Sequence, residues 1–388
     1  MGSHSNLAKT AVKRAENRIV GLDGLRGLMT LFVVASHYFG EVRHGVAAME
    51  VGWLAVKMFF ALSGFLVGRL ILERMTCENF FVVFYVRRFC RTLPVYFFCV
   101  LLVYLCMHLL GSPQWMDIGN EFPLWSYLTF TQNFFMISTD SIGPRWLAPT
   151  WTLSVEEQFY IFAPLLFVLV PRRGLPYFLG GAPILALLFR IAAFEGGLFT
   201  PMTALCMLPG NADSLFAGMF AAVLYKTEAI DWRRWEIGLR IAPVGALVAT
   251  AIIQILGHGT GAWVSSLGFF LVSIGCAAFV LAIARETAEA RHFQSRILCF
   301  FGNTSYSVYL THLTVLGLLH GLVFGARPDI ETAGQIALTF AALPVAFFVG
   351  WVFTKIVEEP ITAYGRTWRW SGARRGAAIA AVATPRAS

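Results

Sequence analysis

The sequence predicts an all-α, polytopic membrane protein with about ten transmembrane helices and both termini in the cytoplasm. Of its 388 residues, 57% are hydrophobic and only 13% are charged, about half the charged share of soluble domains. A soluble fold of this length could not cover its surface with so few charges, because large exposed apolar patches aggregate. The composition therefore excludes a soluble enzyme, a nucleic-acid-binding protein and a disordered chain.

Ten apolar segments are each long enough to cross a bilayer. A hydrocarbon core about 30 Å thick requires about 20 mostly apolar residues in a helix. Segments of this length do not suit a membrane β-barrel, whose strands alternate over about ten residues. In chain order, we expect spans at residues 22–39, 53–72, 92–110, 151–170, 175–194, 202–225, 239–256, 263–284, 306–324 and 333–357.

The basic residues predict the orientation, because cytoplasmic loops are enriched in Lys and Arg. Three basic residues fall on the loops of one side, namely Arg43, Arg145 and Arg327. Three more fall in or at the edge of spans, namely Arg26, Lys57 and Arg190. The remaining 24 of the 30 lie on the other side. We therefore expect one transmembrane domain at 18–365 between two cytoplasmic tails, 1–17 and 366–388, the second of them disordered.

The first span carries two ionisable residues, Arg26 and His37. An ionisable group inside a bilayer costs at least about 2.5 kcal/mol, so each one is a functional candidate. Eleven residues turn a helix about 20° beyond three full turns, so the two side chains share a face about 16 Å apart. His37 is thus either a catalytic base in the outer half of the membrane or a hydrogen-bonded packing residue.

Two adjacent carboxylates, Glu156 and Glu157, lie near the outer end of the fourth span, at a depth similar to that of His37. A carboxylate paired with a histidine orients the imidazole and raises its basicity. We expect one of the two to face His37, since adjacent helical residues point about 100° apart. The alternative is an interfacial pair that headgroup water solvates. Lys57 is a candidate counter-ion for this pair.

The second cytoplasmic loop carries an arginine cluster in which Arg88 and Arg91 are neighbours on one helical face. Guanidinium groups suit phosphate oxygens. Attachment to anionic lipid headgroups is the alternative, and the sequence does not decide between them.

Other polar residues in the spans are candidates for the wall of a pocket. These are Ser63, Tyr160, Asp213 and Tyr309. His312 is expected near the inner end of its span, where a structural hydrogen bond is the simpler explanation. The histidines show no close spacing with Cys or carboxylates, so we expect no metal.

Six motifs follow one another along the chain. They are Leu22-Asp-Gly-Leu-Arg26-Gly with His37; Phe59-Phe-Ala-Leu-Ser-Gly64-Phe; Arg87-Arg88-Phe-Cys-Arg91 with Pro94; Trp151-Thr-Leu-Ser-Val-Glu156-Glu157-Gln-Phe-Tyr160 with Pro164; Phe301-Gly302-Asn-Thr-Ser-Tyr306-Ser-Val-Tyr309-Leu-Thr-His312; and Glu359-Pro360. In this combination and order, the sequence resembles the acyltransferase 3 family of integral membrane acyltransferases. That family O-acylates bacterial surface glycans, exopolysaccharides, signalling oligosaccharides and macrolide antibiotics.

The resemblance implies roles for individual residues. His37 matches the family's catalytic histidine, and Arg88 and Arg91 match the arginine pair associated with the acyl donor, with Arg26 as a further basic residue. Glu156 and Glu157 match the paired acidic motif. Ser63 is a candidate source of hydrogen bonds to the oxyanion.

The implied activity is transfer of an acyl group, acetyl by default, from cytoplasmic acyl-CoA to a hydroxyl of a carbohydrate or macrolide-type acceptor. Acyl-CoA would be a co-substrate and no cofactor would be bound permanently. The expected location is a bacterial cytoplasmic membrane, with the bilayer but no nucleic acid as a partner. Some members carry a fused extracytoplasmic hydrolase-like domain, which we do not expect here. An ion-coupled transporter is the alternative, because Pro209-Gly210 and Asp213 would suit a broken helix at mid-membrane.

Overall fold

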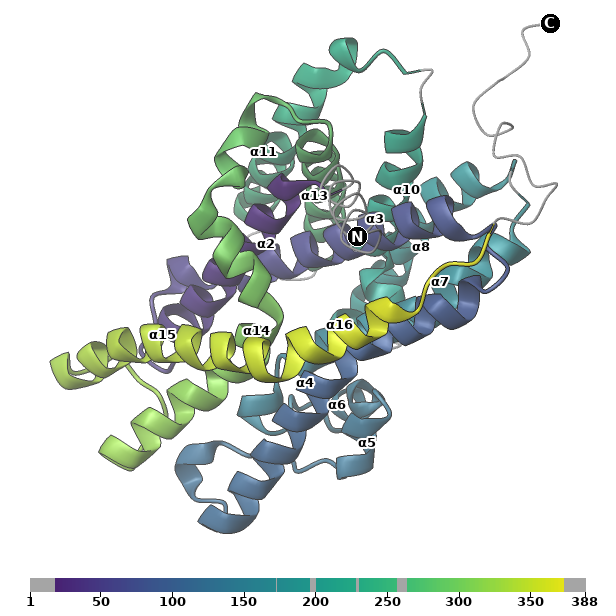
Figure 1. The fold of residues 1–388 in the computed structure, drawn as a ribbon. Coiled ribbons are helices and arrows are strands. Elements are labelled where there is room, and N and C mark those ends of the chain that lie inside the picture. Colours follow the sequence, from purple (N-terminus) through teal and green to yellow (C-terminus); the bar gives the residue numbers. More distant parts are fainter. Residues whose placement is uncertain (1–17, 172, 196–199, 228–229, 257–263, 373–388) are drawn as a thin grey trace, which may run out of the picture.

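The computed structural model describes residues 18–171, 173–195, 200–227, 230–256 and 264–372, and these form helices joined by loops (Figure 1). The predicted N-terminal tail, 1–17, lies outside the described residues. Of the predicted C-terminal tail, 366–388, residues 373–388 also lie outside them, while 366–372 are described and the last helix continues to Thr367. The longer helices are α2 (Val20–Ala35), α3 (Gly52–Arg74), α4 (Phe80–Leu110), α7 (Thr150–Leu169), α8 (Leu175–Glu195), α10 (Leu208–Lys226), α11 (Trp232–Leu256), α13 (Phe269–Ala284), α14 (Arg296–Phe324) and α15 (Ala333–Phe353). The shorter elements are η1 (Ser36–Gly40), η2 (Ala47–Met49), η3 (Gln114–Met116), α5 (Leu124–Leu128), α6 (Gln132–Thr139), η4 (Arg145–Leu147), α9 (Pro201–Cys206), η5 (Val264–Gly268), η6 (Ala288–Gln294), η7 (Thr354–Glu358) and α16 (Glu359–Thr367).

The predicted fold class is confirmed. Within the described residues, nine segments are long and apolar enough to cross a membrane. They correspond to nine of the ten predicted spans, and the remaining one, 22–39, falls on α2 and the π-helix η1 that continues it. The protein is therefore polytopic, while the side on which its termini lie stays a prediction.

Two predicted starts, those of α4 and α14, were wrong by ten residues or more, and both errors moved functional candidates. Helix α3 extends to Arg74 and α4 begins at Phe80, so the arginine cluster lies on a transmembrane helix and not in a loop. The reason is the apolar run 80–86, which continues the helix before the first arginine. Helix α14 begins at Arg296, ten residues before the predicted start, which puts His312 near its middle.

Helices α2 and α14 pack with their backbones in close contact. A Cβ atom on Gly27 would collide with the carbonyl oxygen of Leu298 and would lie 2.8 Å from the backbone nitrogen of Gly302. Only glycine fits there, because the neighbouring atoms belong to the backbone and cannot rotate away. This contact fixes how closely the two helices approach each other.

A buried group of three charges joins α3, α8 and α10. The Asp213 carboxylate lies 3.3 Å from the Lys57 Nζ and 2.7 Å from a guanidinium nitrogen of Arg190, and all three side chains are at most 4% exposed. Two predictions are corrected here. Lys57 pairs with Asp213 and not with Glu156 or Glu157, and Asp213 lines neither of the two cavities described below.

Candidate functional site

Two cavities open toward opposite ends of the helix bundle. The first, which we call the inner cavity, has a volume of about 340 Å³ and lies among α2, α3, α4, α7 and α14. It includes residues from the beginning of α2 and the end of α3, which lie on the same side of the bundle. Its polar lining residues are Arg26, Ser63, Arg69, Glu73, Arg88, Arg91, Thr92, Thr152, Glu156, Tyr160, Ser305, Tyr306 and Tyr309.

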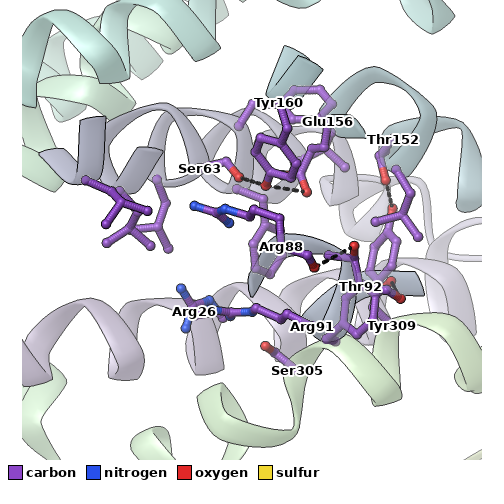
Figure 2. A pocket seen from close by; sticks show the side chains of 18 of the residues that line it. Arg26, Ser63, Arg88, Arg91, Thr92, Thr152, Glu156, Tyr160, Ser305 and Tyr309 are labelled. Atoms are coloured by element: carbon purple, nitrogen blue, oxygen red, sulfur yellow. Dashed lines mark hydrogen bonds between the residues drawn. The ribbon is translucent and has the colours of Figure 1, made fainter. Parts of the chain in front are cut away.

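Three arginines point into the inner cavity (Figure 2). Arg26 is paired with Asp23 at 3.2 Å, and the Arg88 guanidinium lies over the Tyr160 ring, 4.6 Å from its centroid. Neither Arg88 nor Arg91 forms an ion pair with any residue in the described part of the chain. A cation in a membrane cavity without an anionic partner is costly. An anion bound in the cavity would offset this cost.

Glu156 lies beside these arginines and makes its contacts within the inner cavity. Tyr160 donates a hydrogen bond to the Glu156 carboxylate at 3.2 Å, and the Ser63 hydroxyl lies 2.5 Å from the Tyr160 hydroxyl. Glu157 points elsewhere on α7, is only 5% exposed and does not line the cavity. The predicted pocket residues Ser63, Tyr160 and Tyr309 thus line one space with Glu156.

The far end of the inner cavity is closed by Tyr309 and Thr152. Their hydroxyl groups lie 2.9 Å apart, and the Tyr309 hydroxyl also donates to the Pro149 carbonyl at 3.2 Å. The ring of Tyr309 lies 6.0 Å from the ring of His312, centroid to centroid. Tyr309 and His312 therefore form part of the wall behind which His37 lies.

The second cavity, which we call the outer cavity, has a volume of about 840 Å³. Segment 111–149, which lies between the third and fourth predicted spans, contributes both tryptophans of its lining. Three arginines line it, and they are the three that the sequence assigns to outer loops. Its polar and aromatic lining residues are His37, Glu41, Arg43, Gln114, Trp115, Asp117, Arg145, Trp146, Arg327, Asp329, Glu331 and Gln335.

His37 lies at the start of the π-helix η1, with its side chain 15% exposed to the outer cavity. Its Nδ1 atom lies 2.6 Å from Nε2 of His312, and its Nε2 atom lies 3.4 Å from a carboxylate oxygen of Glu41. The prediction that Glu156 or Glu157 orients the imidazole was wrong. Glu156, predicted at a depth similar to that of His37, faces the inner cavity, and Glu157 lines neither cavity.

The sequence reasoning missed two neighbours of His37. Glu41 follows His37 by four residues, a spacing that places two side chains on one helical face, and this signal was available. Its carboxylate also contacts Arg145 at 3.2 Å and the Ser36 hydroxyl at 3.2 Å. His312 is 275 residues away in the chain, and no local pattern links it to His37.

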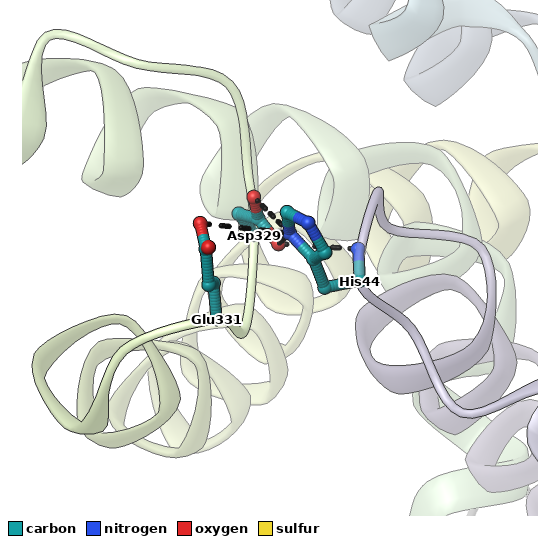
Figure 3. Close-up of side chains that lie close together, drawn as sticks. All are labelled: His44, Asp329 and Glu331. Carbon is teal, nitrogen blue, oxygen red and sulfur yellow. Dashed lines mark hydrogen bonds and ion pairs between the residues drawn. The ribbon is translucent and has the colours of Figure 1, made fainter.

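Beside the outer cavity, His44, Asp329 and Glu331 bring their potential ligand atoms within 4.8 Å of one another, so they could share a metal ion (Figure 3). The sequence did not indicate this grouping, because His44 and Asp329 are 285 residues apart in the chain. In the structure, the His44 Nδ1 atom lies 2.9 and 3.0 Å from the two Asp329 oxygens, while Glu331 is 64% exposed and 3.8 Å away. The bonds between His44 and Asp329 form a clasp between the segment that follows η1 and the loop that joins α14 to α15.

Comparison with known proteins identifies a family whose model matches this chain. Residues 19–355 match the model of a family described as an acyltransferase domain. The chain is 28% identical over 381 residues to "Putative O-acetyltransferase SACOL0978" of Staphylococcus aureus (strain COL), with 90% of this chain and 59% of the relative covered. It is 23% identical over 370 residues to "O-acetyltransferase OatA" of Staphylococcus aureus (strain NCTC 8325 / PS 47), with 89% and 57% covered. The chain thus spans less than two thirds of these relatives, and no solved structure matches it.

Proposed function

Because this chain belongs to the acyltransferase 3 family, we propose that it is a membrane-embedded O-acyltransferase. It moves an acyl group, acetyl by default, from acyl-CoA to a hydroxyl of a carbohydrate or a glycosylated small molecule. The observation that carries the proposal is the pair of cavities: one presents arginines without ion-pair partners among the described residues, and the other presents a histidine held by two polar neighbours.

The inner cavity receives the donor. Acyl-CoA is long and carries its negative charge on phosphates at one end. Arg88 and Arg91, with Arg26 beside them, bind those phosphates through charge-assisted hydrogen bonds. The pantetheine arm then lies along the apolar part of the cavity, with the thioester toward Thr152 and Tyr309. In the predicted orientation, this cavity opens to the cytoplasm, where acyl-CoA is found.

The outer cavity receives the acceptor. Its lining combines two tryptophans with charged and amide side chains. Aromatic faces pack against the apolar faces of sugar rings, and the polar groups form hydrogen bonds with the hydroxyls. Among the described residues, Arg43 lines this cavity without an ion-pair partner, so it can bind an acidic group of the acceptor.

His37 acts as the general base. Its Nε2 atom takes the proton of the acceptor hydroxyl while that oxygen attacks the thioester carbonyl. The carbon–sulfur bond then breaks, the ester forms, and the thiolate of CoA takes the proton from the imidazolium. The Glu41 carboxylate, held by Arg145 and Ser36, stabilises the imidazolium while it exists.

Transfer requires the wall between the two cavities to open. The thioester in the inner cavity is separated from His37 by Tyr309 and His312. A rotation of the Tyr309 ring costs its two hydrogen bonds, each worth about 1 kcal/mol net. Donor binding can supply that amount, so a closed wall in the free enzyme is compatible with transfer.

The experiment compares cells that produce the wild-type protein with cells that produce His37→Ala. Mass spectrometry of surface glycans and secreted small molecules identifies the acylated product. Membrane vesicles of the same cells, given radiolabelled acetyl-CoA, then measure transfer. We expect the variant to accumulate in the membrane normally but to lose the ester. Wild-type levels of ester in the His37→Ala cells would overturn the proposal.

A further inference from the structure

The partner of the catalytic histidine is a second histidine. His312 is fully buried near the middle of α14, and its ring plane lies within 5° of that of His37. With the two nitrogens 2.6 Å apart, the rings meet edge to edge in one hydrogen bond. Which ring donates depends on where the protons are.

The proton positions follow from a backbone carbonyl. The Nδ1 atom of His312 lies 3.1 Å from the carbonyl oxygen of Val308. A carbonyl only accepts, so this nitrogen carries the hydrogen. No carboxylate contacts His312 within the described part of the chain, and a buried, unpaired imidazolium would be costly, so the ring is neutral. Its Nε2 atom is then unprotonated and accepts a hydrogen bond.

This assignment fixes the state of His37. To satisfy the acceptor on His312, the Nδ1 atom of His37 must carry a hydrogen. The neutral His37 ring therefore keeps its lone pair on Nε2, which faces the outer cavity and lies 3.4 Å from the Glu41 carboxylate, beyond the range of an N–H hydrogen bond. That nitrogen is the one that must take a proton from the acceptor hydroxyl.

Resting on the proposed function, we infer that His312 is a positioning residue that holds His37 in the Nδ1–H tautomer. It takes the place that a carboxylate has in a serine-hydrolase triad. The Tyr38 hydroxyl donates to the His312 carbonyl at 2.9 Å, which ties the helix that carries His37 to α14 beside the pair and keeps the two rings in register.

The test uses His312→Phe, which fills the space but accepts no hydrogen bond, and His312→Gln, whose amide oxygen replaces the acceptor. His320→Phe is the matched control, because His320 is also buried on α14 but bonds to Thr339. We expect His312→Phe to lower kcat by at least about 100-fold, by analogy with triad variants that hold the wrong tautomer. The KM for acetyl-CoA should stay unchanged, and His312→Gln should recover at least about tenfold of the loss.

Nitrogen-15 NMR of histidine-labelled protein in detergent gives a second readout. The His37 signal, identified by its absence in His37→Ala, should report the Nδ1–H tautomer in the wild type and in His312→Gln. If His312→Phe does not fold, this spectrum and the activity of His312→Gln decide. An Nε2–H tautomer in the wild type, or equal kcat in His312→Phe and His320→Phe, would overturn the inference. If either result overturns the inference while His37→Ala is inactive, the proposed function stands without this role of His312.

Discussion

The glycine contact between α2 and α14 predicts a specific effect of the substitution Gly27→Ala. The added Cβ atom would lie 2.8 Å from the backbone nitrogen of Gly302, which is 0.6 Å short of the 3.4 Å at which ordinary contact begins. The Leu298 carbonyl oxygen is closer still. That oxygen is 2.0 Å away, 1.4 Å short of the same limit, so the helices must separate by about 1.4 Å to relieve both contacts. An equal shift at His37 would stretch its 2.6 Å separation from His312 to about 4.0 Å, beyond the upper limit of about 3.2 Å for an N–H hydrogen bond.

Two effects should follow and can be measured separately. Overpacking costs about 1–3 kcal/mol, partly offset by a helix propensity of Ala that is about 1 kcal/mol better than that of Gly. Thermal unfolding in detergent should show a modest loss of stability. Transfer from radiolabelled acetyl-CoA in vesicles should fall by on the order of 100-fold, because the tautomer of His37 is no longer fixed.

The matched control is Gly245→Ala on α11, where an added Cβ meets nothing within 4 Å. It should keep full activity and should be as stable as the wild type or up to about 1 kcal/mol more stable. If Gly27→Ala behaved like Gly245→Ala in both measurements, the close packing of α2 on α14 and its role in holding the histidine pair would be refuted.

Three further predictions concern other parts of the molecule. Replacing Arg88 and Arg91 by Ala should weaken acetyl-CoA binding, measured by calorimetry, by more than about tenfold, since each charge-assisted hydrogen bond contributes about 1.5–3 kcal/mol; unchanged affinity would assign these arginines to lipid anchoring. Asp213→Asn should cost about 3–5 kcal/mol of stability because it leaves two buried cations without a counter-ion, and an unfolding temperature equal to that of the wild type would contradict this. Burial raises the pKa of Asp329, but hydrogen bonds from His44 and from the Ile330 amide lower it below the ordinary 3.8. The fold therefore stabilises the ionised carboxylate at neutral pH. That stabilisation is lost as the pH falls through the lowered pKa. Asp329→Asn should therefore reduce stability at pH 7 by about 1 kcal/mol, seen as a lower unfolding temperature, and should have less effect below pH 3.8; an effect independent of pH would speak against the clasp.

The spans were predictable because a bilayer imposes a length and an apolar composition on every helix that crosses it. The α2 region shows where this reasoning loses detail. Its span was found, but the π-helix over Ser36–Gly40 was not, because an added residue in one turn leaves the hydrophobic pattern almost unchanged. The arginines of α4 were placed in a loop because charge was taken to end a span.

The partners of His37 could not be predicted in the same way. Helical periodicity gives the face on which a residue lies, and counting from the span ends gives its depth. Neither quantity says which other helix that face meets. Glu156 and His37 were predicted at similar depths but line different cavities, whereas His312, predicted near the inner end of its span, is the residue in contact. Pairing between helices is set by packing, here by glycines such as Gly27 that allow close approach.

The six basic residues that the positive-inside rule does not explain now have places. In the structure, four of them line the two cavities and two belong to the buried charged group. They are Arg43, Arg145 and Arg327 at the outer cavity, Arg26 at the inner cavity, and Lys57 and Arg190 around Asp213. The three that lie in the spans, Arg26, Lys57 and Arg190, cost free energy unless a partner, a ligand or solvent stabilises the charge. Basic residues that the positive-inside rule does not explain therefore indicate sites, because they do not set the orientation and a charge inside the bilayer needs a stabilising partner.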